Sequence, residues 1–144
     1  MKRESLSLEE TRRIAEEFLS DLKPVKDQAT LVCLSGDLGA GKTAFTQSIA
    51  SVLGIADPIT SPTFVLEKIY RIPDHPRFSH LIHIDAYRLE SGRELAALGW
   101  DSILSEPKNL IILEWPERVA NLLPVERLMV NLTFINETTR IIEW

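Results

Sequence analysis

Apolar side chains recur every three to four positions in two stretches of the chain, residues 8–22 and 42–53. This spacing places them on one face of a helix, so both stretches are predicted to be amphipathic helices. Ser7, with a glutamate three residues later, has the pattern of a capping box before the first helix, and Gly54 follows the second where a C-terminal cap belongs. The charged residues 1–5 are expected to lead into the first helix as helical backbone.

Other stretches carry the patterns of strands. Residues 30–35 and 110–113 are short, mostly apolar runs without alternation, which favours strands buried on both faces of a sheet. Residues 65–72 and 81–85 flank a proline-rich turn and are predicted to pair as an antiparallel hairpin. The remaining elements expected are short helices at 93–98 and 117–122 and strands at 128–134 and 139–142. Strands alternating with helices predict an α/β fold: a three-layer sandwich around a mostly parallel central sheet with antiparallel additions, in a single domain over residues 1–144.

The segment between the first strong strand and the second helix carries the clearest chemical signal. Residues Gly36-Asp37-Leu38-Gly39-Ala40-Gly41-Lys42-Thr43 satisfy the pattern G-x-x-x-x-G-K-S/T, the Walker A motif or P-loop. Its glycines let backbone N–H groups approach phosphate oxygens, and the following helix adds unpaired N–H donors and the positive end of its dipole. Lys42 supplies a positive charge to the β- and γ-phosphates, and the Thr43 hydroxyl suits a Mg²⁺ ligand. The motif predicts a P-loop NTPase that binds a nucleoside triphosphate with Mg²⁺.

Two of the predicted strands end in a carboxylate, Asp85 and Glu114. In open α/β sheets ligands bind beyond the carboxyl ends of the strands, so both acids are expected near the nucleotide. One acid would hold Mg²⁺ opposite Thr43 and the other would orient the attacking water, and the sequence leaves open which acid does which. His83 is expected to be a buried, sheet-facing histidine, and no pair of histidines has metal-ligand spacing. The hydroxyl residues within 60–64 are candidates for a loop that senses the γ-phosphate.

The composition narrows the classes of partner. The formal net charge is −5, opposite to the basic surface that direct binding of a nucleic-acid backbone needs. The lone Cys33 lies in an apolar run and is expected to be a buried thiol, so neither a disulfide framework nor a zinc site can be built. With neither a signal-peptide pattern nor an apolar stretch long enough to span a bilayer, a cytoplasmic protein without a membrane partner is expected.

Four blocks of sequence follow one another along the chain. They are the P-loop itself, Ser61-Pro62-Thr63-Phe64, His83-Ile84-Asp85-Ala86-Tyr87-Arg88-Leu89 and Leu113-Glu114-Trp115-Pro116-Glu117. Together they resemble the TsaE family, the ATPase partner in bacterial tRNA threonylcarbamoyladenosine synthesis. The P-loop alone indicates only a superfamily, whereas the other three blocks are specific to the family.

The resemblance implies a weak ATPase that uses ATP and Mg²⁺, docks on the proteins TsaD and TsaB, and meets tRNA only through these partners. It implies catalytic roles for Lys42, Asp85 and Glu114. Thr43 and Glu114 would hold Mg²⁺, and Asp85 would lie beside the metal ion and the water. Asp85 is also a candidate metal ligand, because which of the two acids binds Mg²⁺ directly stays open. The residues implied for nucleotide binding are Thr11, Asp37, Leu38, Gly39, Ala40, Gly41, Lys42, Thr43, Ala44 and Thr63, with Arg140 also approaching the nucleotide.

Two other functions stay open on the residues alone. Many small-molecule kinases share a P-loop and this size, although no segment between the predicted elements has the pattern of an arginine-bearing lid. The protein is alternatively a switch in which bound nucleotide orders residues 61–64 for a partner and hydrolysis is incidental. A GTPase is less favoured because the guanine-reading motif N-K-x-D does not occur.

Overall fold

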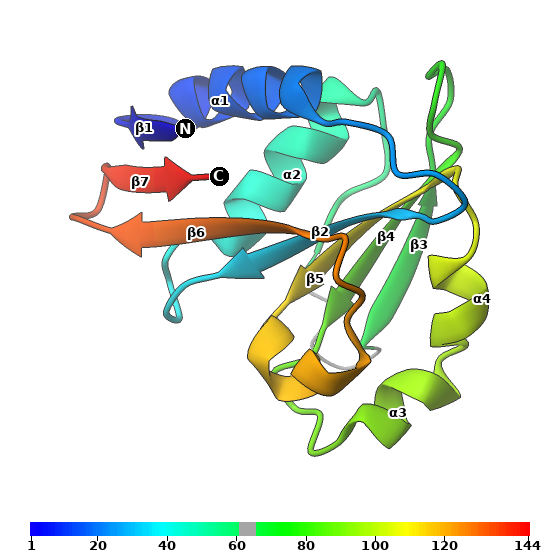
Figure 1. Cartoon of the computed structure of the whole chain (residues 1–144). Coiled ribbons are helices and arrows are strands. Elements are labelled where there is room, and N and C mark those ends of the chain that lie inside the picture. The colour runs from blue at the N-terminus through cyan, green and yellow to red at the C-terminus, as the bar shows by residue number, and fades with distance from the viewer. Residues whose placement is uncertain (61–65) are drawn as a thin grey trace.

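Seven strands form one mixed sheet in the computed structural model, which describes residues 1–60 and 66–144 (Figure 1). The strands are β1 (Lys2–Ser5), β2 (Thr30–Ser35), β3 (Glu67–Arg71), β4 (His80–Asp85), β5 (Asn109–Glu114), β6 (Leu128–Phe134) and β7 (Arg140–Glu143). The helices are α1 (Leu8–Asp21), α2 (Lys42–Val52), α3 (Gly92–Ala97), α4 (Trp100–Leu104) and the 3₁₀ helix η1 (Pro116–Leu122). Across the sheet the strands follow the order β1-β7-β6-β2-β5-β4-β3.

The inner strands β6, β2, β5 and β4 run parallel, while β7, β1 and β3 join the sheet by antiparallel pairing. β2 and β5 are buried along almost their whole length, as their unbroken apolar runs predict for strands covered on both faces. β3 and β4 form the predicted antiparallel hairpin, with Ile69 opposite Ile82. The α/β class is confirmed. Three of the six strand pairings are antiparallel, so the seven-stranded sheet as a whole is mixed, with a parallel centre and antiparallel additions toward its edges.

Helices cover both faces of the sheet, and alternate residues of each strand pack beneath them. On the face covered by α1 and α2, here called the α2 face, the rings of Phe18 and Phe45 meet edge to face with 5.6 Å between centroids. On the face covered by α3, α4 and η1, here called the α3 face, Leu95, Trp100 and Val119 join a second apolar cluster (Figure 1). The predicted three layers are therefore present, with a separate core on each side of the sheet.

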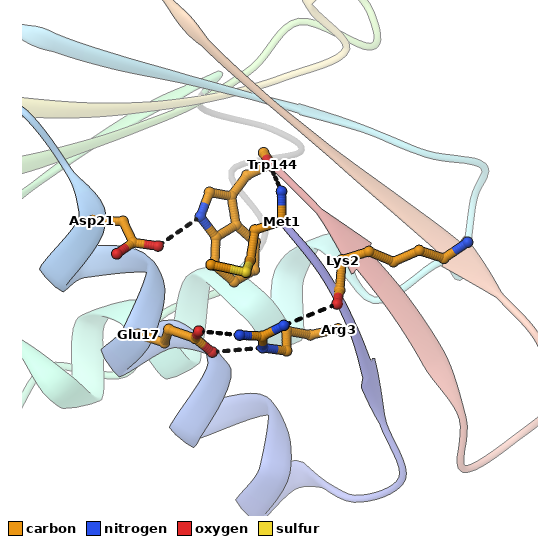
Figure 2. Close-up of polar contacts among 6 residues, drawn as sticks. All are labelled: Met1, Lys2, Arg3, Glu17, Asp21 and Trp144. Atoms are coloured by element: carbon orange, nitrogen blue, oxygen red, sulfur yellow. Dashed lines mark hydrogen bonds and ion pairs between the residues drawn. The ribbon is translucent and has the colours of Figure 1, made fainter.

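The N-terminal residues form a strand instead of the helical backbone expected for them. β1 pairs with β7 at the edge of the sheet, and Figure 2 shows the contacts that hold it there. The Arg3 guanidinium donates two hydrogen bonds to the Glu17 carboxylate on α1, one of them 2.8 Å from Nε to Oε2. The Met1 amino group donates to the Trp144 carbonyl oxygen, and the Trp144 indole N–H donates to Asp21 over 3.2 Å. The helical expectation was wrong because the partners that order this segment lie far away along the chain.

The other predicted elements are found within a few residues of their expected bounds, with one addition. α4 was not expected. The sequence predicted one helix that stops at Gly99; the observed α3 ends at Ala97, and a separate helix begins after Gly99. Trp100, the first residue of α4, is 2 % exposed, and its indole N–H donates to the Leu122 carbonyl oxygen over 3.2 Å. Packing of one aromatic ring thus fixes a segment too short to show helical periodicity. Over the described residues, the helices all lack the length and apolar character needed to cross a membrane.

Candidate functional site

Residues 36–41 connect the end of β2 to the start of α2, at the carboxyl ends of the parallel strands. Gly41 takes the left-handed conformation, with φ of 98°, directly before α2, and no side chain caps the helix there. At Gly36 a Cβ atom would lie 2.6 Å from the carbonyl oxygen of Leu132 on β6, so a larger residue would push these backbones apart. The Gly-rich turn predicted from the pattern is therefore present, with the uncapped N-terminus of a helix beside it.

Lys42 begins α2, and its side chain folds back over the loop. The residue is 6 % exposed, and Nζ donates to the carbonyl oxygens of Gly36 and, over 3.1 Å, of Asp37. Nζ also lies 4.4 Å from the centroid of the Trp115 ring. Burial lowers the pKa of the Lys42 ammonium, while carboxylates nearby, Glu114 the strongest, raise it. The ammonium is therefore held inside the loop by carbonyl oxygens whose place an anionic ligand can take.

Asp85 and Glu114 end the neighbouring strands β4 and β5 and stand opposite each other in register. Leu81 and Ile112, an even number of positions earlier on the same strands, pack in the core of the α2 face, so both acids lie on that face. Glu114 is 3 % exposed, and its Oε2 lies 2.6 Å from Nε2 of the fully buried His83. The structure thus brings the two predicted acids together on the side of the sheet where α2 begins.

The two acids have different surroundings. Asp85 is half-buried, and its Oδ1 accepts a hydrogen bond of 2.9 Å from the Tyr87 backbone N–H. Burial raises the pKa of the Asp85 carboxyl, the Tyr87 hydrogen bond lowers it, and the charge of Glu114 raises it further. Two adjacent carboxylates repel each other when both are ionised, which favours a cation beside them.

These groups line one pocket of about 240 Å³. The residues that line it are Leu38, Gly39, Gly41, Lys42, Thr43, Ala44, Asp85, Glu114 and Trp115. Its one hydroxyl and two carboxylates are hard oxygen donors of the kind that Mg²⁺ prefers, and Mg²⁺ usually keeps water or phosphate oxygens as further ligands. Over residues 1–60 and 66–144, no cluster of three or more His, Cys, Asp and Glu side chains could hold a metal ion by itself. The donor set therefore fits a Mg²⁺ ion that arrives together with a phosphate ligand.

A second pocket, of about 310 Å³, adjoins the first. Gly41 and Ala44 line both pockets, which places the start of α2 between them. Thr11 lines the second pocket from α1, and its hydroxyl lies 2.6 Å from that of Ser5. Arg140 lines it from β7, and its Nε is buried without a hydrogen-bond partner among the described residues. A mostly apolar hollow with hydroxyl groups and a guanidinium thus lies next to the pocket that holds the acids, with the start of α2 between them.

Three further predicted site residues, Asp37, Leu38 and Ala40, belong to the loop itself. Asp37 and Leu38 are exposed on the loop, and Ala40 is buried beneath it. Asp37 lies outside the pocket with the acids and lines a different hollow, between the loop and β6. Thr63 and the rest of its proline-containing segment lie outside the described residues.

Two contacts of the site were missed by the sequence reasoning. One is the hydrogen bond between His83 and Glu114, and the other is the position of Lys42 over the Trp115 ring. The sequence held a signal for one half of the first contact only: His83 and Asp85 are two positions apart on a strand, so His83 must share a face with a predicted site residue, but its partner Glu114 follows from strand register. No pattern in the sequence indicates the second, since Trp115 follows the end of β5 with a left-handed φ of 58°.

Comparison with known proteins gives consistent matches over nearly the whole chain. The family model for TsaE, threonylcarbamoyl adenosine biosynthesis protein, matches residues 5–142. A protein of Rickettsia bellii named tRNA threonylcarbamoyladenosine biosynthesis protein TsaE is 38% identical over 136 residues, which cover 94% of this chain and 88% of the relative. A protein of the same name from Mycobacterium bovis is 38% identical over 121 residues, 79% of this chain and 70% of the relative. The crystal structure of the Bacillus protein YdiB superposes with a TM-score of 0.74 at 31% identity, over 99% of this chain and 82% of that one.

Proposed function

Since the chain belongs to the TsaE family of tRNA threonylcarbamoyladenosine biosynthesis proteins, we propose that it is a P-loop ATPase that binds ATP with Mg²⁺ and hydrolyses it in support of that modification. The observation that carries the proposal is that residues of the P-loop and the two acids line one pocket, at the carboxyl ends of β4 and β5. In it the Walker A residues Lys42 and Thr43 face Asp85 and Glu114. A cation, a hydroxyl and two carboxylates converging beside a helix N-terminus are the parts that phosphoryl transfer to water requires.

The loop residues would bind the phosphates. Lys42 now donates to the carbonyl oxygens of Gly36 and Asp37, and phosphate oxygens are stronger acceptors for the same ammonium. The N–H groups at the start of α2 would point toward the same oxygens, because no side chain caps this helix. Positive charge and backbone donors are therefore in place before the nucleotide arrives, which is the condition for electrostatic stabilisation of the transferring group.

Thr43 and Glu114 would hold the metal ion, and Asp85 would hold the attacking water. Mg²⁺ supplies neutralisation of the charge on the phosphate oxygens when it is bound. Glu114 offers Oε1 to the metal, since Oε2 is engaged by His83. Asp85 offers Oδ2 to the water, since Oδ1 accepts the Tyr87 N–H. The raised pKa of the Asp85 carboxyl means that it accepts a proton more readily than an exposed aspartate does.

The second pocket would receive the nucleoside. It adjoins the phosphate pocket at Gly41 and Ala44, so a nucleotide whose phosphates lie on the loop reaches it directly. Arg140 packs beside Gly41 and presents a buried Nε that lacks a partner within the described residues. Thr11 supplies a hydroxyl from α1. These two residues would contact the nucleoside or the first phosphate.

We infer that hydrolysis is slow until partner proteins bind. Among the residues that line the phosphate pocket in the described part of the chain, Lys42 is the only cation. Fast P-loop enzymes usually add an arginine that stabilises charge in the transition state. A net charge of −5 also argues against direct contact with tRNA, so the partners TsaD and TsaB would bring the ATPase to its pathway.

Calorimetry and a phosphate-release assay test the proposal. ATP should bind with an affinity that rises when Mg²⁺ is added, and free phosphate should appear slowly with the chain alone and faster with TsaD and TsaB. No heat on titration with ATP would overturn the proposal. Equal rates with and without the partners would refute partner activation, and transfer of the phosphate to a small acceptor would indicate a kinase instead. If Glu114→Ala keeps both partner binding and tRNA modification, the protein is a switch whose hydrolysis is incidental.

A further inference from the structure

The side chain of the fully buried His83 contacts Glu114, but the proposed chemistry gives His83 itself no role. Nε2 of His83 lies 2.6 Å from Oε2 of Glu114, and the two side chains are 0 % and 5 % exposed. We propose that His83 is a positioning residue for the metal site: by donating to Oε2, it fixes the Glu114 carboxylate so that Oε1 faces the metal ion. This inference rests on the proposed Mg²⁺-ATP function.

The strand geometry explains how the contact arises. His83 stands opposite Ile112 in the register of β4 and β5, and Glu114 lies two positions further along β5 on the same face. Diagonal neighbours on adjacent strands are close enough for long side chains to meet. The contact therefore places the imidazole behind the carboxylate, on the side away from the end of the strand where the pocket opens.

The hydrogen-bond inventory assigns the proton to Nε2. A carboxylate oxygen can only accept in this pair, so Nε2–H is the donor. Nδ1 is buried and has no partner among the described residues, which suits a lone pair better than an N–H group. His83 therefore donates from Nε2 to the Glu114 carboxylate.

Burial makes this donor necessary for an ordered carboxylate. A buried carboxylate without a partner is costly, so Glu114 without His83 would rotate toward solvent or bind a proton. Either change would remove Oε1 from the position where a metal ligand is needed. Groups that orient metal ligands in this way typically contribute about 10- to 100-fold to metal affinity.

A pair of amide substitutions tests the inference. In His83→Gln the side-chain NH₂ reaches about as far as Nε2, whereas in His83→Asn the amide stops near the position of Nδ1. The probe is Mn²⁺ titrated into the complex of the full chain with ADP, with free Mn²⁺ followed by electron paramagnetic resonance. We expect His83→Asn to weaken Mn²⁺ binding about tenfold or more, and His83→Gln to stay within about threefold of the unsubstituted protein. Affinity for ADP in EDTA should change less than about twofold in both variants.

His80→Asn is the matched control, since His80 is exposed at the start of the same strand. It should leave both affinities unchanged. Unchanged Mn²⁺ binding in His83→Asn would overturn the inference, as would an equal loss of Mn²⁺ binding and of metal-free ADP binding. If His83→Asn does not fold, His83→Gln decides: affinity within about threefold supports positioning, and a tenfold loss contradicts it. Failure of the unsubstituted protein to bind ADP at all would count against the proposed function itself.

Discussion

The two faces of the sheet are built from the same strands but carry different chemistry. On the α3 face, β2, β4 and β5 bury apolar side chains in the middle of each strand, and polar residues stand only at strand ends. The apolar residues are Leu31, Cys33, Ile82, Ile84, Ile111 and Leu113. On the α2 face, β4 and β5 begin with the apolar Leu81 and Leu110 but carry His83, Asp85 and Glu114 toward their ends. Both faces are buried, so burial alone does not explain the difference.

The position of α2 explains it. α2 follows β2 directly and lies on only one face, so its N-terminus and the loop before it serve that face alone (Figure 1). A carboxylate at the end of β5 on this side meets Lys42 and Thr43, whereas one on the other side would meet only the apolar cluster. The comparison indicates that one face serves stability alone and that the other, in the proposed function, serves binding as well. Substitutions on the two faces should therefore affect different properties.

The largest effect is expected for Lys42→Ala. The change removes the one cation lining the phosphate pocket in the described part of the chain, so the rate of ATP hydrolysis should fall about 100- to 1,000-fold. ATP affinity measured by calorimetry should fall as well. Lys108→Ala removes an exposed lysine and should change neither quantity. A Lys42→Ala protein with normal hydrolysis would place the chemistry elsewhere on the molecule.

The next largest effect separates the two faces directly. Ile111 and Ile112 are adjacent on β5, both fully buried, and pack on opposite faces. Either isoleucine changed to alanine should lower the free energy of unfolding by about 2–5 kcal/mol, measured by urea denaturation. Only Ile112→Ala leaves a cavity beside His83, its partner in register, and it should lower the hydrolysis rate about threefold to tenfold. If Ile111→Ala lowers the rate equally, the two faces are not independent.

The sequence predicted the strands, the loop and the two acids because each has a local pattern. Residues 31–34 and 110–113 are unbroken apolar runs, and the P-loop is a contiguous motif. β1 was not predicted because its partner β7 is formed by the last residues of the chain. The contact between His83 and Glu114 joins residues 31 positions apart, so it follows from strand register, which the sequence does not specify.

A smaller effect is expected at the far end of the α2 face, where Arg140 lines the second pocket. Arg140→Ala should weaken ATP binding about tenfold, because it removes a charged donor with a buried Nε from the side of the nucleoside or first phosphate. Inorganic triphosphate lacks the nucleoside, so its affinity should change less than that of ATP. The matched control is Arg127→Ala, an exposed arginine at the other end of the sheet, close to the start of β6. Equal losses for ATP and triphosphate would show that Arg140 serves the phosphate chain alone.

The smallest effect is a gain of stability. Burial raises the pKa of the Asp85 carboxyl above its ordinary value of 3.8, so the folded chain holds this proton more tightly than the unfolded chain. The contribution of Asp85 to the free energy of unfolding is therefore greatest in acid and falls as the pH rises through the range between 3.8 and the raised pKa.

The variant Asp85→Asn does not ionise, so it lacks this loss of stability, and its amide oxygen can still accept the Tyr87 N–H. In EDTA its melting temperature should match that of the unsubstituted protein in acid and exceed it at pH 7. The gain should be only about 1–2 °C, because Asp85 is half-exposed and solvent screens its charge. The control is Asp57→Asn, at an exposed acid that does not line the phosphate pocket. With Mg²⁺ and ATP the order should reverse, since ligand binding stabilises the unsubstituted protein more. If Asp85→Asn is less stable than the unsubstituted protein at pH 7 without metal, the paired acids do not lower the free energy of unfolding and this prediction is wrong.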